Sequence, residues 1–217
     1  MINLSYKAVI FDLDGTLLNT LEDLTDSTNY ALEKCGFKTR NISEIRRFVG
    51  DGMPLLIKRA LPESASEADF DKCFELFCEH YKTNMANKTA PYEGVCDVLE
   101  SLHGRGIKTA IVTNKGDFAA QQLCKEKFGG SVDVVVGGSP DLPKKPAPDG
   151  VYIALEMLGV SKKDAVFVGD SQVDFMTAKN AGLDCISVLW GFREREELEK
   201  IGADRFCDNV SQLEKMI

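Results

Sequence analysis

The chain has 217 residues, of which 44% are hydrophobic and 28% charged, a composition that excludes wholesale disorder. Its net charge of −8 and the lack of a basic stripe exclude a nucleic-acid partner. A net-negative protein does not attract an anionic substrate at long range, so any phosphate must be bound by local cations and backbone amides.

Residues 7–11 (KAVIF) form a short apolar run that ends at Asp12 and predicts a buried strand. The chain from about residue 21 to residue 89 then contains no convincing strand pattern. It predicts helices over 21–35, 43–48, 54–60 and 67–81. We therefore expect a helical insert after the first strand, with the sheet resuming near Pro91.

Apolar runs and helical patterns alternate over the rest of the chain. The predicted strands are 108–112, 132–136, 165–168 and 185–189, and the predicted helices are 95–103, 118–128, 149–158 and 174–181. Asp149 is a plausible N-cap, and Gly159 and Gly182 are expected to end their helices. This alternation predicts a parallel sheet with helices on both faces.

Polar residues follow the ends of four predicted strands, where an open parallel sheet binds its ligands. The segments, in chain order, are Asp12-Leu13-Asp14-Gly15-Thr16, Thr113-Asn114-Lys115-Gly116, Lys144-Lys145-Pro146 and Gly169-Asp170-Ser171-Gln172-Val173-Asp174. Each of them alone fits a turn or a helix cap. Together they would crowd four carboxylates at one edge, and a divalent cation relieves that repulsion. Oxygen ligands without His or Cys favour Mg²⁺.

The spacing of Asp12 and Asp14 allows both to face the site while Leu13 points into the core. Gly15 allows a tight turn that brings backbone amides close to a phosphate. An ionised Asp is a nucleophile at neutral pH, and Lys145 and Thr113 can offset charge on a transferring phosphoryl group. The pattern thus favours phosphoryl transfer.

DxDGT after the first strand, Thr after the second, Lys before Pro, and GDxxxD after the fourth resemble the haloacid dehalogenase superfamily. The four signatures span residues 12–174, and DGTLLNT, KPAPDG and GDSQVD are similar to its phosphoglycolate phosphatase-like branch. The resemblance implies a Rossmann-like α/β core with a small all-helical cap. We expect the core to comprise residues 1–18 and 90–217, and the cap residues 19–89.

The resemblance also implies roles for single residues. Asp12 would be the nucleophile and a Mg²⁺ ligand. Asp14 would act as general acid and then base, and its carbonyl would also bind Mg²⁺. The remaining roles are a metal ligand (Asp170), a residue that supports the metal from outside or through water (Asp174), and phosphoryl-binding residues (Gly15, Thr113, Asn114 and Lys145). Asn19 stands where many relatives carry Asp, which weakens any transfer of their substrate preference.

In capped members of the superfamily, the cap closes over the site and contributes substrate contacts. Here Arg46 and Arg47 are candidates, because arginine suits a carboxylate such as that of glycolate phosphate, although adjacent arginines usually include a solvated one. The segments near 19–20 and 86–91 are the expected hinges.

The expected function is Mg²⁺-dependent hydrolysis of a small phosphorylated metabolite, with phosphoglycolate as the leading substrate. A phosphosugar mutase and a pyrophosphatase of the same superfamily are alternatives. A phospho-accepting signalling module, which also combines Asp residues, Mg²⁺, Thr and Lys, is a further one. Nucleotide-binding motifs of the GxxxxGK[ST] and GxGxxG types are absent from the sequence. The sequence indicates no particular oligomeric state.

The seven cysteines are odd in number and mostly lie in apolar runs, which favours free thiols in a reducing cytosol. Cys73, Cys78 and His80 match no usual zinc spacing. The start of the chain does not resemble a signal peptide, and no apolar run is long enough to span a bilayer. We therefore expect a soluble, cytoplasmic protein without a membrane partner.

Overall fold

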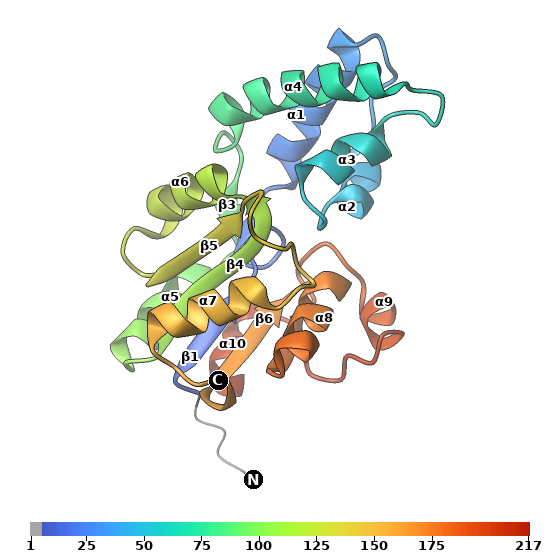
Figure 1. Ribbon diagram of the computed structural model, residues 1–217. Coiled ribbons are helices and arrows are strands. Elements are labelled where there is room, and N and C mark those ends of the chain that lie inside the picture. Colours follow the sequence, from blue (N-terminus) through green and yellow to red (C-terminus); the bar gives the residue numbers. More distant parts are fainter. Residues whose placement is uncertain (1–5) are drawn as a thin grey trace.

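The computed structural model describes residues 6–217, and its centre is a six-stranded sheet in the order β5-β4-β1-β6-β7-β8 (Figure 1). All five pairs of neighbouring strands are parallel. The strands are β1 (Ala8–Phe11), β4 (Lys108–Gly116), β5 (Val134–Gly138), β6 (Ala165–Gly169), β7 (Asp184–Val188) and β8 (Phe206–Cys207). Because β1 pairs with both β4 and β6, its carboxyl end lies between theirs.

The central strand β1 is buried on both faces, with all four of its side chains inaccessible to solvent. Ala8 and Ile10 join one hydrophobic cluster, whereas Val9 and Phe11 join the other. Successive side chains of a strand point to opposite faces, so both sides of the sheet need a covering layer.

Helices supply both layers. Helices α7 (Asp149–Leu158) and α8 (Gln172–Ala181) pack on the face of Ile10. Helices α5 (Val95–Gly104), α6 (Asp117–Phe128) and α10 (Val210–Met216) pack on the face of Phe11. The short helices α9 (Arg195–Glu199) and η1 (Lys162–Asp164) complete the core domain.

The cap consists of α1 (Leu21–Lys34), α2 (Ile42–Phe48), α3 (Met53–Ala60) and α4 (Glu67–Asn84), above the carboxyl ends of the strands (Figure 1). Its helices bury Ile45, Ile57 and Phe77 between them. Capping boxes start two helices, because Asn41 precedes α2 and Ser66 precedes α4. Apolar contacts between the cap helices and capping boxes within the cap thus stabilise it.

Two short antiparallel strands join the cap to the core, β2 (Leu18–Asn19) and β3 (Ala90–Pro91). The carboxylate of Asp23, at the start of α1, accepts hydrogen bonds from the amides of Lys88 and Thr89 and from the hydroxyl of Thr89. This buried carboxylate fixes the returning chain against α1 beside the ribbon.

The predicted fold class is confirmed: a parallel α/β sheet with a helical insert after the first strand. Gly159 and Gly182 end α7 and α8 in left-handed conformations, as expected. The N-cap prediction for Asp149 is wrong, because Pro148 is the N-cap and Asp149 the first helical residue. The domain boundaries at 18/19 and 89/90 stay predictions.

Several elements were not expected from the sequence: β2, β3, β8, η1, α9 and α10. Each is at most seven residues long, which leaves few residues for a periodic pattern. Helix α8 also begins earlier than predicted, since Ser171 is its N-cap and Asp174 closes the capping box.

All seven cysteines are free, and Cys96 alone is exposed. Within residues 6–217, no helix is both long enough and apolar enough to cross a bilayer. The start of the chain, on which the signal-peptide expectation depends, lies partly outside these residues.

The Asp23 network generates a stability prediction. Asp23→Ala leaves two backbone amides and a hydroxyl without their acceptor, and should lower the free energy of unfolding by about 2–3 kcal/mol. Urea unfolding followed by circular dichroism measures the change. Asp26→Ala is the matched control, because Asp26 pairs with Lys88 at the exposed surface and should cost less than about 1 kcal/mol. Equal losses in the two variants would contradict the assignment.

Candidate active site

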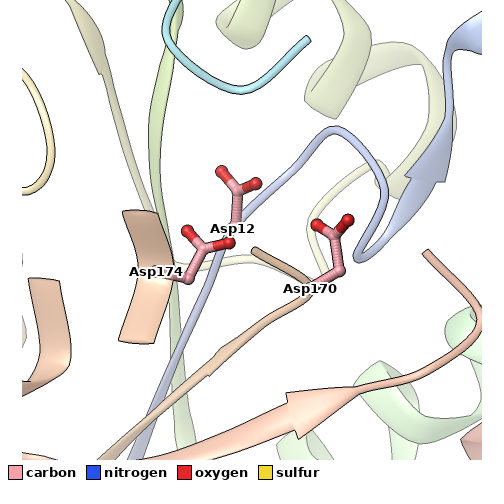
Figure 2. A group of neighbouring side chains, drawn as sticks. All are labelled: Asp12, Asp170 and Asp174. Atoms are coloured by element: carbon pink, nitrogen blue, oxygen red, sulfur yellow. The ribbon is translucent and has the colours of Figure 1, made fainter. Parts of the chain in front are cut away.

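Three aspartates meet at the carboxyl edge of the sheet (Figure 2). Asp12 follows β1, Asp170 follows β6 and Asp174 lies in the first turn of α8. All three are buried, and an oxygen of each lies within 4.8 Å of the others. Within residues 6–217 they form the single such group of carboxylate, imidazole or thiol side chains. The predicted convergence of Asp12 and Asp170 is thus observed.

Lys145 is the buried cation of this group. Its Nζ donates to Asp12 Oδ1 and to Asp174 Oδ1, both at 2.7 Å. The other oxygen of Asp174 accepts from the amide and the hydroxyl of Ser171 at 3.0 and 2.6 Å. Both oxygens of Asp174 are therefore engaged, which suits its predicted supporting role.

The carboxylates strongly influence one another. Burial and the charge of Asp174 raise the pKa of Asp12 to about 7, although Lys145 opposes the shift. Burial, Asp174 and Asp12 raise the pKa of Asp170 to about 8. Burial lowers the pKa of Lys145, but the two carboxylates outweigh it and the net pKa lies above the usual value. The group thus carries more negative charge than one lysine balances.

The surroundings of Asp170 fit a bound Mg²⁺. Its oxygens accept from Thr16 Oγ1 at 3.2 Å and from the amide of Phe192 at 2.7 Å. Glycines enclose it, since a Cβ on Gly15 would lie 2.6 Å from its Oδ2, and one on Gly191 2.3 Å from its Cβ. A rigidly oriented, buried oxygen donor set without nitrogen or sulfur matches a hard divalent cation. Asp12 and Asp170 would hold the ion, with Asp174 beside them.

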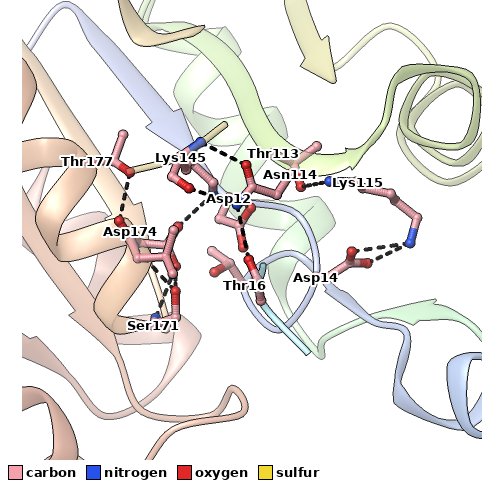
Figure 3. A network of polar contacts seen from close by, with 12 residues as sticks. Asp12, Asp14, Thr16, Thr113, Asn114, Lys115, Lys145, Ser171, Asp174 and Thr177 are labelled. Carbon is pink, nitrogen blue, oxygen red and sulfur yellow. Dashed lines mark hydrogen bonds and ion pairs between the residues drawn. The ribbon is translucent and has the colours of Figure 1, made fainter. Parts of the chain in front are cut away.

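Asp14 does not join the three aspartates. Its carboxylate instead faces Lys115, whose Nζ donates to Oδ1 at 3.0 Å and to Oδ2 at 3.2 Å (Figure 3). A metal contact of Asp14 would thus come from its carbonyl oxygen, as the resemblance implies, and stays a prediction.

The predicted phosphoryl-binding residues lie next to the three aspartates. Asn114 accepts from the amide of Lys145 at 2.8 Å and so orders the lysine loop, and the hydroxyl of Thr113 accepts from the amide of Lys115. The amide of Gly15 donates to the carbonyl of Leu18. The left-handed φ of +90° and the closeness of Asp170 explain why glycine stands at this position. Phosphate contacts of all these residues stay predictions.

The loop after β7, residues 190–194, connects the aspartates with the cap. Besides the Phe192 amide that binds Asp170, it carries Arg193, which donates to the cap carbonyls of Arg46 and Val49 at 2.9 and 2.6 Å. Arg46 in turn donates to the carbonyl of Gly191 at 2.9 Å. Cap and core thus hold each other through reciprocal arginine contacts.

These contacts bear on the two candidate cap arginines. Arg46 contacts the core loop and Glu194, whereas Arg47 is exposed. Neither lines the cavity above Asp12, so their substrate contact stays an expectation without support from this arrangement.

The cavity between cap and core is small, about 40 Å³. Its walls are Asp12, Asp14, Thr113, Asn114 and Lys115 from the core and Leu24, Val49, Gly50, Gly52, Met53 and Leu56 from the cap. The nucleophile candidate and Asp14 therefore border the same cavity.

Sequence reasoning missed Thr16, Lys115, Ser171 and the 190–194 loop. A signal existed for most of them. Lys115 directly follows Thr113 and Asn114, and the loop follows the fifth predicted strand, where polar residues also gather. The spacing of Ser171 and Asp174 fits a capping box.

Comparison with known proteins assigns the chain to a family. The model of the family described as haloacid dehalogenase-like hydrolase matches residues 9–188. The chain belongs to this family. The four motifs on which the sequence resemblance to this family rests contain Asp12, Thr113, Lys145 and Asp170. In the structure these motifs lie at the carboxyl edge of the sheet.

Relatives within the family include phosphoglycolate phosphatases. The protein of that name from Pseudomonas fluorescens (strain Pf0-1) is 32% identical over 213 residues, which cover 95% of this chain and 78% of the relative. A solved structure from Lactobacillus delbrueckii subsp. bulgaricus, provisionally named a phosphoglycolate phosphatase, has a TM-score of 0.93 at 34% identity and 98% coverage of both chains. A predicted phosphoglycolate phosphatase from Haemophilus somnus 129PT has a TM-score of 0.91 at 27% identity, covering 100% of this chain and 99% of its own.

The sole tryptophan allows a direct test of the metal site. Trp190 donates to the carbonyl of Thr16 at 2.9 Å and lies in the loop that binds Asp170, so Mg²⁺ binding should change its fluorescence. Asp170→Asn should weaken Mg²⁺ binding at least about tenfold in a fluorescence titration. Asp208→Asn, a change at the exposed surface, should leave the titration unchanged. Wild-type affinity in Asp170→Asn would contradict the site.

Proposed function

We propose that this chain is a Mg²⁺-dependent phosphatase of small phosphomonoesters in which Asp12 accepts the phosphoryl group. The observation that carries the proposal is the position of Asp12. It is buried at the end of β1, bonded to Lys145, close to Asp170 and Asp174, and open to the cavity that Asp14 also borders.

In the first step, an Asp12 oxygen attacks phosphorus, the bond to the leaving oxygen breaks, and Asp14 delivers a proton to that oxygen. In the second step, water attacks phosphorus, the bond to Asp12 breaks, and Asp14 takes the proton from water. Asp14 serves both steps, because it loses its proton in the first step and can therefore accept a proton in the second.

Charge compensation supports this chemistry. Lys145 already donates to both Asp12 and Asp174, so its positive charge stands beside the carboxylate to which a phosphoryl group would be transferred. Bound Mg²⁺ would supply the remaining positive charge for the phosphoryl oxygens. Thr113 and Asn114 would donate hydrogen bonds from the neighbouring strand end.

Phosphoglycolate is the substrate that we favour. The support is the named relatives and the small cavity, which suits a compact phosphomonoester better than a nucleotide. Closure by the cap excludes water from the transfer.

The nucleophile is tested by one substitution. Asp12→Asn replaces the attacking carboxylate with an amide of the same shape and should abolish phosphate release from p-nitrophenyl phosphate, with wild-type circular dichroism. EDTA should likewise stop the wild-type enzyme, and Mg²⁺ should restore it. Substantial turnover by Asp12→Asn would refute the assignment.

The substrate is tested by comparison of kcat/KM values. 2-Phosphoglycolate should exceed ethyl phosphate, which lacks the carboxylate, and glucose 1-phosphate, which is larger, by at least about tenfold each, a difference of about 1.4 kcal/mol. Inorganic phosphate is measured as the product, because a sugar phosphate isomer without phosphate release would mean a mutase. Equal values for all three would leave phosphoglycolate without support.

A further inference from the structure

Lys115 is a buried lysine that the proposed chemistry does not use. It stands near the end of β4, and its side chain is 1% exposed. Among the residues that line the cavity above Asp12, Lys115 is the one with a positively charged side chain. Burial lowers its pKa, but Asp14 and Tyr81 outweigh this effect and the net pKa lies above the usual value. A buried, charged lysine beside an active-site cavity needs a reason, because its desolvation is costly.

Its three contacts suggest that reason. Nζ donates to both oxygens of Asp14 and, at 2.7 Å, to the hydroxyl of Tyr81. An ammonium group has three donors, so these contacts use its full capacity. The contacts to both carboxylate oxygens fix the direction of the Asp14 carboxylate as well as its position.

Tyr81 belongs to the cap. It lies near the end of α4, is 2% exposed and stacks on Phe77 in the interior of the cap. The bond between Tyr81 and Lys115 therefore joins cap and core directly at the acid–base residue. Lys115 can reach this hydroxyl and Asp14 together only while the cap is closed over the sheet.

We propose that Lys115 is a positioning residue that aims the carboxylate of Asp14 at the cavity, and that Tyr81 holds Lys115 in place when the cap is closed. The inference rests on the proposed function, because it assigns Asp14 the proton transfers described above. Without Lys115, the Asp14 carboxylate loses its cation and is free to rotate, so proton transfer slows while the nucleophile keeps its surroundings.

p-Nitrophenyl phosphate separates the two halves of the reaction. Its phosphoryl group moves to Asp12 as the bond to 4-nitrophenolate breaks, and this weakly basic anion leaves without a proton. Hydrolysis then needs Asp14, which takes the proton from water as the bond between phosphorus and Asp12 breaks. A loss of Asp14 function should thus appear as rapid nitrophenolate release followed by slow turnover.

The experiment is stopped-flow measurement of nitrophenolate release. Lys115→Met should show a burst of about one equivalent per active site and a kcat lowered about 100-fold, and it should reproduce Asp14→Asn. The phosphorylated enzyme should be visible in the intact mass. Lys82→Met is the matched control, because Lys82 lies on α4 beside Tyr81 but is exposed, and it should show neither change.

Tyr81→Phe keeps the ring and removes the hydroxyl. It should lower kcat about 3- to 10-fold with a smaller burst, since one hydrogen bond is lost. This variant also decides the matter if Lys115→Met does not fold. Steady turnover without a burst in a folded Lys115→Met, or wild-type kinetics in Tyr81→Phe, would overturn the inference. The proposed function would still stand if Asp12→Asn is inactive, and it would fall separately if Asp12→Asn turns over.

Discussion

The burial of three carboxylates at one sheet edge is the constraint on which the remaining structure depends. Like charges in a dry environment repel, and the raised pKa values of Asp12 and Asp170 express that cost. The local structure compensates for this repulsion, because Lys145 donates hydrogen bonds to Asp12 and Asp174. Glycines leave space for the side chain of Asp170. The parallel order of β1 and β6 makes the convergence unavoidable, because it brings both strand ends to the same place. The charge that remains is what a divalent cation would neutralise.

The cap depends on the same edge. Three of its contacts with the core come from segments that also shape the site: the loop that carries Phe192 and Arg193, Asn114 with its bond to the carbonyl of Gly50, and Lys115 with its bond to Tyr81. The closed position of the cap is therefore held by residues that are neighbours of the aspartates. The same contacts hold the cap closed and order the residues around the aspartates. Opening of the cap would therefore free side chains of both the cap and the core.

The sequence predicts the fold and much of the site for physical reasons. Strands such as β1 and β6 are uniformly apolar because both of their faces are buried, and polar residues stand out sharply at their ends. Asp12, Asp170 and Lys145 were accessible to this reasoning. The roles of Lys115 and Arg193 were not, although Lys115 stands beside Thr113 and Asn114 in the sequence, because a lysine or arginine usually remains in water and their partners in the cap lie far away in the sequence. The partner of Asp14 was missed for the same reason. Short elements such as β8 and α9 offer too few residues for a periodic signal.

The two-stranded ribbon has a consequence for how such proteins diversify. The chain enters the cap through β2 and returns through β3, and the pairing of Leu18 with Pro91 and of Asn19 with Ala90 keeps the two crossings about 5 Å apart. The cap is therefore an insertion whose two ends are held at a fixed spacing by these pairs. A smaller or larger insert with the same end spacing would leave the strand order and the aspartates undisturbed. The ribbon thus uncouples the size of the cap from the geometry of the edge that carries the aspartates.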